Sequence, residues 1–492
     1  MTGLRAARAL RAGDHESFDF PEPGRSLTAV HQDLALRVRV DDASPTRSLF
    51  GLPPTAALTE DELRHWQHCL DEAWRTLVTR HRPAAEVLTA VLRVIVPVLP
   101  DPDAEGISAT SAEAFGAVAM SAPADPTALT VGLLHETMHS VLNAVNLLFD
   151  LVRPGGEPGY SPWRDDPRPA PGVLHGAYAY LAVTRFWRTE LQASPSSSPS
   201  SPSSTLTPPP PPAPPRSCES GQPRSRTDQQ DRGETGRDRG KGGPQHEQAT
   251  PPRSCESEQP HPRIDQQDRG EAGRECGDAG RERGGTGWER GAAFEFARWR
   301  GAVAEAAEGL LGGGELTPAG ARFVSALLDE VRPWLAEPVD AEAARLAGLA
   351  RADHRLRWRL RNLAVTPPDA AELARAWRDG RKPPEVSPIP AASSGRALEN
   401  SPRLRLIRAH LKGEAADSAA AGDDACVRGD LATALRSYEM GLEKDRDQDL
   451  GWAGLALVSP HPALRSRPEV VKAAALALPD VPIAALADWL SG

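Results

Sequence analysis

Residues 135–139 read HETMH, which puts two histidines four positions apart with a glutamate directly after the first. On an α-helix, residues four apart share a face, so His135 and His139 can present two imidazoles to one divalent metal ion. Glu136 can then reach a metal-bound water or a substrate proton. We therefore predict a metal site with His135 and His139 as ligands and Glu136 as a catalytic residue. The alternative is a pair of ordinary surface histidines, as we predict for His65 and His68.

A catalytic metal ion needs a third protein ligand in addition to two imidazoles. The metzincin spacing would require Gly at 142 and His at 145, and the chain has Leu142 and Val145 instead, which excludes that pattern. The best downstream candidate is His175, which we expect at the start of a helix, after a constrained loop and among small residues. Glu190, on the same predicted helix, is the alternative third ligand.

A Pro-rich loop, residues 161–169 with the sequence SPWRDDPRP, precedes that helix. The planar guanidinium of arginine suits carboxylates, so Arg164 or Arg168 could bind a carboxylate near the metal ion. These arginines could equally fix the loop through ion pairs with Asp165 or Asp166. The spacing alone leaves both interpretations open.

The metal-site helix should cover about residues 126–152, with Asp125 as its N-cap and Pro126 in its first position. Two short strands are expected within 106–122, and the second, at 115–121, leads into this helix. The apolar run 87–99 could be helix or strand. Other helices are expected at 59–81, with a capping box of Thr59 and Glu62, and at 175–191, 292–311, 317–335, 341–363 and 369–379.

Residues 194–290 separate these elements into two groups. The segment opens with Ser and Pro, and the heptapeptide PPRSCES at 214–220 recurs at 251–257. It has too few aliphatic residues to bury a core, so we predict a disordered low-complexity insertion.

We assign 1–193 to the N-terminal part of a metal-binding catalytic domain, 291–395 to its helical continuation and 400–492 to a helical tail. Gly429, Ala434 and Tyr438 give the tail the pattern of one tetratricopeptide unit, or of an ordinary helical hairpin. The expected fold class is mainly α with a small β element (α+β), in which a zincin-like strand precedes the HExxH helix.

The chain of 492 residues has 57 Lys and Arg against 67 Asp and Glu, a net charge of −10, which argues against a broad nucleic-acid footprint. Its five cysteines form no CxxC pair, as in a protein with free thiols in a reducing compartment. Neither a secretory signal nor an apolar run of membrane-spanning length is found. We therefore expect a cytoplasmic protein that binds neither membrane nor nucleic acid.

Taken together, residues 135–139, 161–169 and 174–178 resemble the HExxH-type peptide β-hydroxylases, known as HExxH motif-containing putative peptide modification proteins. That family is associated with ribosomally made, post-translationally modified peptides. The resemblance implies Fe(II) and 2-oxoglutarate as cofactors and hydroxylation of a β-carbon, for example of Asp, in a precursor peptide. It further implies that His135, His139 and His175 bind iron and that Arg164 or Arg168 binds a carboxylate of 2-oxoglutarate.

Three histidines depart from the two-His-one-carboxylate set of non-haem iron oxygenases. This departure leaves the role of Glu136 open and keeps zinc as the alternative metal. A zinc peptidase with Glu136 as general base is accordingly the second functional hypothesis. The third is a non-enzymatic helical protein that binds partners through its tail. Expected partners are the precursor peptide and, through the C-terminal helices, other peptide-maturation proteins.

Overall fold

The computed structural model describes residues 25–101, 106–193, 286–391, 401–414 and 420–492. These residues are mostly helical, with a small mixed sheet, so the fold class is α+β. Residues 194–285, which contain nearly all of the predicted insertion and its duplicated heptapeptide, lie outside the described residues. Within the described part, none of the helices combines the length and apolar character needed to cross a membrane.

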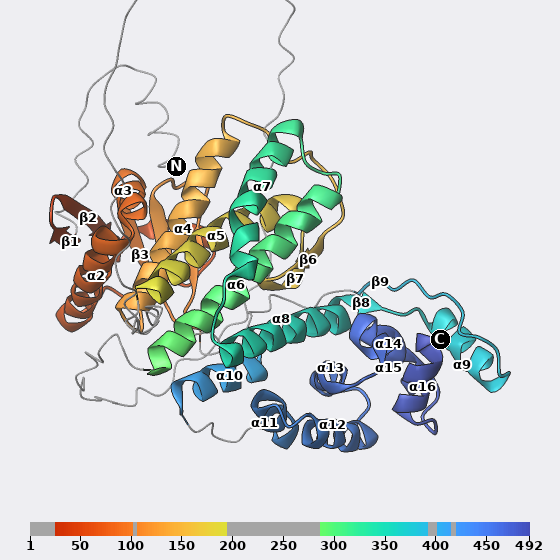
Figure 1. The fold of residues 1–492 in the computed structure, drawn as a ribbon. Coiled ribbons are helices and arrows are strands. Elements are labelled where there is room, and N and C mark those ends of the chain that lie inside the picture. The colour runs from red at the N-terminus through yellow and green to blue at the C-terminus, as the bar shows by residue number, and fades with distance from the viewer. Residues whose placement is uncertain (1–24, 102–105, 194–285, 392–400, 415–419) are drawn as a thin grey trace, which may run out of the picture. The chain divides into compact units, whose positions relative to one another are not determined.

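Five strands form one sheet in the order β1–β2–β3–β5–β4. Strands β2, β3 and β5 run parallel, whereas β1 and β4 pair antiparallel with β2 and β5. The short strand β4 therefore forms one edge of the sheet (Figure 1). The strand bounds are β1 Ser26–His31, β2 Leu34–Val40, β3 Val94–Val98, β4 Ser108–Thr110 and β5 Ala117–Ser121.

The two strands predicted within 106–122 are confirmed as β4 and β5. The ambiguous run 87–99 divides into the end of α3 (Arg82–Val91) and β3. The β1–β2 hairpin was not expected, because its turn carries no glycine. Gln32 takes the left-handed conformation there, at φ 52°, which is uncommon for a residue with a side chain.

The metal-site helix α4 (Pro126–Asn146) begins as predicted, and the Asp125 side chain accepts a hydrogen bond of 2.8 Å from the Ala128 backbone N–H. It ends earlier than the expected residue 152. The three apolar residues that follow, Leu147, Leu148 and Phe149, are exposed. Their apolar character suggested a continued buried helix face, but no described element covers them.

The next helix, α5 (Ala170–Gln192), begins five residues before the predicted start. His175 therefore lies in the second turn, and the expectation that it begins the helix was wrong. Pro171 at the second position of α5 is the local start signal that fits the observed boundary. The predicted loop before α5 contains a hairpin of β6 (Gly159–Ser161) and β7 (Arg164–Arg168).

The remaining predicted helices are confirmed with small shifts at their ends. The capping box of α2 (Glu60–Arg80) is present, with Thr59 Oγ1 accepting from the Glu62 N–H and the Glu62 carboxylate accepting from the Thr59 N–H. The helices after residue 285 are α6 (Thr286–Gly312), α7 (Pro318–Val331), α8 (Ala341–Asn362) and α9 (Pro367–Arg378). The tail contains α10 (Pro402–Lys412), α11 (Ala421–Arg428), α12 (Leu431–Lys444), α13 (Asp449–Val458), α14 (Pro462–Ser466), α15 (Pro468–Ala477) and α16 (Ile483–Ser491).

Helix α4 packs against α2, α3 and strands β4 and β5, and it also lies beside α5, which in turn runs along α6 (Figure 1). One apolar core joins the sheet to α2 and α4, and a second joins α4 to α5, α6 and α7. Helix α8 contacts α6 as well as the tail helices α10, α13 and α15. The metal-site helix is thus held by two cores, which fixes its orientation.

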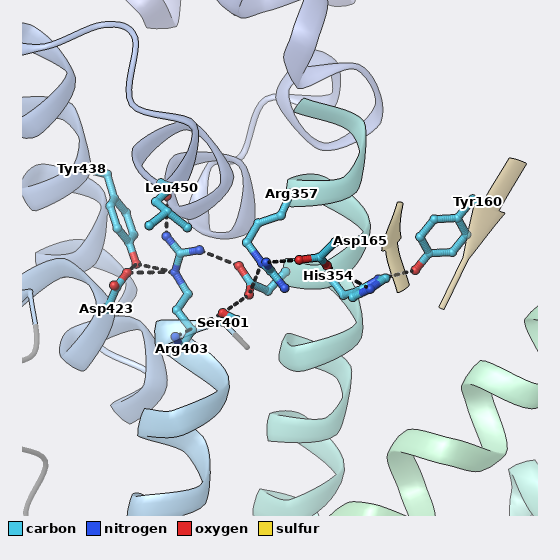
Figure 2. A network of polar contacts seen from close by, with 10 residues as sticks. Tyr160, Asp165, His354, Arg357, Ser401, Arg403, Asp423, Tyr438 and Leu450 are labelled. Carbon is cyan, nitrogen blue, oxygen red and sulfur yellow. Dashed lines mark hydrogen bonds and ion pairs between the residues drawn. The ribbon is translucent and has the colours of Figure 1, made fainter. Parts of the chain in front are cut away.

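A buried arginine joins α8 to the tail. The Arg403 guanidinium donates to the carboxylates of Asp353 in α8 and Asp423 in α11 and to the backbone carbonyl of Leu450 in α13 (Figure 2). Arg403 is 1% exposed, and Tyr438 Oη donates to the same Asp423 oxygen at 2.7 Å. Charges this far from water are tolerated only when they are paired and hydrogen-bonded.

We expect Arg403→Met to lower the free energy of unfolding by about 3 kcal/mol or more, because the Asp423 carboxylate loses its counter-charge and the buried Asp353 carboxylate keeps only Arg357. Urea denaturation monitored by circular dichroism measures the loss. Arg428→Met is the matched control, since Arg428 makes an exposed pair with Asp424 and its loss should cost less than about 1 kcal/mol. Equal losses in the two variants would contradict the structural role of Arg403.

Candidate metal centre

The two predicted histidine ligands face each other. His135 and His139 lie one turn apart on α4, with their Nε2 atoms 3.0 Å apart and their rings edge to face. Two nitrogens that are each about 2.1 Å from one ion lie about 3.0–3.4 Å apart at bond angles between 90° and 110°. The observed separation fits two ligands of a common cation, and without the cation it is that of an N–H···N hydrogen bond between the rings.

Burial keeps these imidazoles neutral. It lowers the pKa of His135 and lowers the pKa of His139 to about 4, the latter with a further contribution from His135. A neutral imidazole retains the lone pair that binds a metal ion. At neutral pH, neither ring has to lose a proton before it can act as a ligand.

The Glu136 carboxylate is held by the edge strand. Its side chain is buried, and its two oxygens accept hydrogen bonds from Ser108 Oγ, at 2.6 Å, and from Thr110 Oγ1. The ligand atoms of His135, Glu136 and His139 all lie within 4.8 Å of one another. Glu136 is thus close enough to take part in the site, but both of its oxygens already have a hydroxyl donor.

The predicted third ligand, His175, lies next to this group. Its ring stacks on that of His139, with centroids 5.6 Å apart and an interplanar angle of 24°. Its Nε2 is 3.2 Å from the amide nitrogen of Asn146, and burial lowers its pKa to about 4. The structure therefore brings the His175 ring to the site, although its nitrogens fall outside the 4.8 Å group.

The alternative third ligand, Glu190, has other partners. Both of its oxygens accept hydrogen bonds of 2.7 Å from the Arg80 guanidinium, and His81 Nε2 lies 2.8 Å away. These contacts join the C-terminal part of α5 to the end of α2. Since Glu190 is not among the clustered ligand atoms, it is not a candidate in this conformation.

The predicted carboxylate-binding arginines both lie on β7 and share one partner. Arg164 Nε is 3.0 Å and Arg168 Nε is 3.1 Å from the Asp166 carboxylate. Ion pairing to Asp166, one of the two sequence-based interpretations, is therefore present.

The hairpin is brought to the site by Trp163, at its turn. A Cβ atom at Gly176 would lie only 2.0 Å from the Trp163 indole nitrogen, so the absence of a side chain lets the indole approach α5 one position after His175. Trp163 stacks on Tyr180 at 5.1 Å, and Tyr180 stacks on Trp299 of α6 at 4.0 Å. The sequence after residue 285 thus contributes directly to the wall of the site.

Tyr180, Ser108 and Thr110 are site residues that the sequence analysis missed. The Tyr180 ring is 4.7 Å from that of His135, and burial raises the pKa of its hydroxyl to about 12, so it stays protonated at neutral pH. Ser108 and Thr110 are two residues apart on a strand and therefore share a face. This spacing is the one local feature from which their common role could have been predicted. Nothing in the local sequence links Tyr180 to His135.

The donor set fits a divalent transition metal: two buried neutral imidazoles face each other, with a third imidazole and a carboxylate beside them. The comparisons with known proteins add no family. No protein-family model matches the chain, and no curated protein matches it. The resemblance to peptide β-hydroxylases therefore remains a prediction made from the residues.

We expect His135→Ala and His139→Ala each to abolish stoichiometric Co(II) binding, because a single imidazole remains from the facing pair. His175→Ala should weaken binding and alter the Co(II) absorption spectrum, whereas Glu136→Gln should leave stoichiometric binding intact. Calorimetry and visible spectroscopy measure both effects, with the exposed His68→Ala as control. Stronger loss in Glu136→Gln than in His175→Ala would instead assign the carboxylate as the third ligand.

The metal-free protein should lose stability as the pH falls from about 6.5 towards 4. In this range the unfolded chain, with histidine pKa values near 6.5, binds more protons than the folded one, in which the pKa values of His139 and His175 are about 4. Urea unfolding of chelator-treated protein at several pH values measures the slope. His139→Asn should make it shallower and His68→Asn should not. An unchanged slope in His139→Asn would refute the assignment.

Proposed function

We propose that this protein is a metal-dependent enzyme that modifies a ribosomally made peptide, by Fe(II)- and 2-oxoglutarate-dependent hydroxylation of a β-carbon such as that of Asp. One combined observation carries the proposal: the His135 and His139 Nε2 atoms face each other at 3.0 Å, while both Glu136 oxygens are engaged by hydroxyls of β4. The imidazoles would supply metal ligands, and each oxygen of the glutamate already accepts one hydrogen bond from a hydroxyl of β4.

The metal ligands would be His135, His139 and His175. His175 is included because its neutral ring already stacks on His139, and its Nε2 contacts only an amide that can rotate away. In this arrangement Glu136 is a positioning residue that ties α4 to the edge strand. Fe(II) with 2-oxoglutarate, when bound, supplies the oxidising chemistry, and three protein ligands leave coordination positions for it.

Arg164 and Arg168 are the proposed partners of a 2-oxoglutarate carboxylate. Both guanidinium groups already contact the Asp166 carboxylate, and the planar fork of arginine suits a 2-oxoglutarate carboxylate in the same way. The stacked rings of Trp163, Tyr180 and Trp299 form an apolar wall next to His135. Such a wall keeps water away from reactive groups in the site.

A peptide substrate would lie along β4. This strand is a sheet edge in the described part of the chain, and its side chains at 108 and 110 already reach Glu136. Main-chain pairing with such an edge is a common way to bind an extended peptide. From the sequence, the strand at 115–121 was the one that could pair with a peptide, but that strand is β5, which lies between β3 and β4.

We also propose that the mixed sheet, its antiparallel edge strand β4 and the HExxH helix form a zincin-like arrangement, which would favour a zinc peptidase as the second candidate. There Glu136 would be the general base for a zinc-bound water. The two hydroxyl donors on Glu136 compete with that water, which is why we rank hydrolysis second. The helical tail, which we propose to be tetratricopeptide-like, would bind other peptide-maturation proteins in either case.

The experiment combines anaerobically purified protein, Fe(II), 2-oxoglutarate and O₂ with synthetic candidate precursor peptides taken from the neighbourhood of the gene. We expect the peptide to gain the mass of one oxygen atom, with one succinate released per oxygen added. Mass spectrometry and a succinate assay measure the two products. His139→Ala should abolish both, and His68→Ala should abolish neither.

The other outcomes separate the candidates. Absence of succinate with every peptide tested, together with zinc-dependent peptide cleavage that Glu136→Gln removes, would establish the peptidase instead. A protein that purifies without metal, and whose melting temperature is unchanged by Fe(II) or Zn(II), would support a non-enzymatic helical protein.

A further inference from the structure

One face of α8 surrounds Tyr160 of β6 with polar side chains. Arg351, His354, Arg355 and Trp358 occupy positions i, i+3, i+4 and i+7 and so lie on one side of the helix. Tyr160 Oη is 3.1 Å from His354 Nδ1, the Arg355 guanidinium lies 4.7 Å above the Tyr160 ring, and the Trp358 ring meets it edge-on at 5.4 Å. We call these five residues the α8 polar seam.

Two N–H donors in this seam have no acceptor among the described residues. They are the indole Nε1 of Trp358 and the Nε of Arg351, and both are shielded from solvent. Trp358 as a whole is 8% exposed. Folded proteins rarely leave a buried donor unpaired, and such a donor is expected where an ion, water or ligand binds. Both groups can only donate, so the missing partner is an acceptor.

The charges of the seam point to an anionic acceptor. Arg351 and Arg355 both pair with the same carboxylate, that of Glu305 in α6. Two guanidinium groups share one negative charge, so a second carboxylate would restore neutrality. Gly301 of α6 makes room for this arrangement, because a Cβ atom there would lie 2.1 Å from Arg351 Nη1.

A chain of polar contacts leads from the seam to Arg403 (Figure 2). Burial lowers the pKa of His354 to about 3, and its neutral ring lies with Nε2 3.4 Å from the Asp165 carboxylate of β7, which pairs with Arg357 at 3.3 Å. Arg357 contacts Asp353 at 3.2 Å, and Arg403 fixes Asp353 in turn. The seam is therefore pre-organised, which reduces the entropic cost of binding a ligand.

We propose that the α8 polar seam binds a carboxylate, with Trp358 Nε1–H and Arg351 Nε–H as donors and the Arg355 guanidinium as an additional charge. Tyr160 of the seam belongs to the β6–β7 hairpin. The same hairpin carries Trp163, which stacks on Tyr180 beside His135. The ligand of the seam is therefore either a free dicarboxylic acid or the acidic side chain of a peptide. Only the identity of the ligand rests on the function proposed above. Binding of a carboxylate to the seam needs no metal.

Calorimetry on the full-length, chelator-treated protein tests the site without relying on activity. The probes are 2-oxoglutarate, a hexapeptide containing Asp, and the same hexapeptide with Asn in place of Asp. We expect one carboxylate probe to bind and the Asn peptide not to bind. Trp358→Phe and Arg351→Gln should each weaken binding about tenfold or more, as expected for loss of one charge-assisted hydrogen bond.

Matched controls exist for both variants. Trp66 also has a buried indole N–H without an acceptor, in α2, and Arg332 makes one exposed pair with Asp329. Trp66→Phe and Arg332→Gln should leave binding unchanged. Binding of 2-oxoglutarate or of the Asp peptide that Trp358→Phe and Arg351→Gln weaken supports the site and identifies the source of the carboxylate. Binding that both variants leave unchanged places the carboxylate elsewhere, for example at Arg164 and Arg168, and overturns it. No heat with either carboxylate probe, or equal affinity in Trp358→Phe and Trp66→Phe, overturns it whether or not the enzyme hydroxylates peptides.

Discussion

Burial of two imidazoles on adjacent turns of one helix is the constraint around which the site is built. Taking His135 and His139 out of water favours their neutral forms, and it places two Nε2 atoms 3.0 Å apart where at most one can carry the shared proton. A cation relieves this crowding of lone pairs. The packing around α4 must therefore hold the two rings in place, and the sheet, α2 and α5 provide it.

The surrounding side chains come from segments far apart in the sequence. The β4 hydroxyls bind Glu136 on one side of α4, and Tyr180 of α5 meets His135 on another. Trp299 of α6 continues the stack that Tyr180 begins. Segments on both sides of residues 194–285 therefore contribute to one candidate site, as expected if 291–395 continues the domain that 1–193 begins.

What the sequence could predict is what depends on near neighbours along the chain. The start of α4, its Asp125 cap and the shared face of the two histidines all follow from residues within one or two turns. The partners of Glu136 and the position of Tyr180 depend on which elements pack together, and no local pattern encodes that. The partners of the β7 arginines could be predicted in part. The sequence offered Asp165 or Asp166 as their partner. In the structure both arginines contact Asp166, whereas Asp165 pairs with Arg357 of α8.

The hairpin of β6 and β7 shows why a buried ion network is retained next to the site. A two-stranded hairpin is only marginally stable by itself, and this one has an irregular register between Gly159 and Ser161. Buried ion pairs add little net stability, but they are costly to break and so can specify one arrangement. The Asp165 backbone carbonyl accepts from the Asn362 side chain at 2.7 Å, and its carboxylate joins the chain of pairs that ends at Arg403.

Together with Trp163 against Gly176, these contacts hold the hairpin on α5 and α8 at once. The position of Arg164 and Arg168 beside the metal centre therefore depends on helices of the tail more than 200 residues away, because Arg403 connects α8 to α11 and α13. A partner that moved the tail helices would act on the hairpin through Asp353, Arg357 and Asp165. The tail is in this sense part of the structure that positions the site.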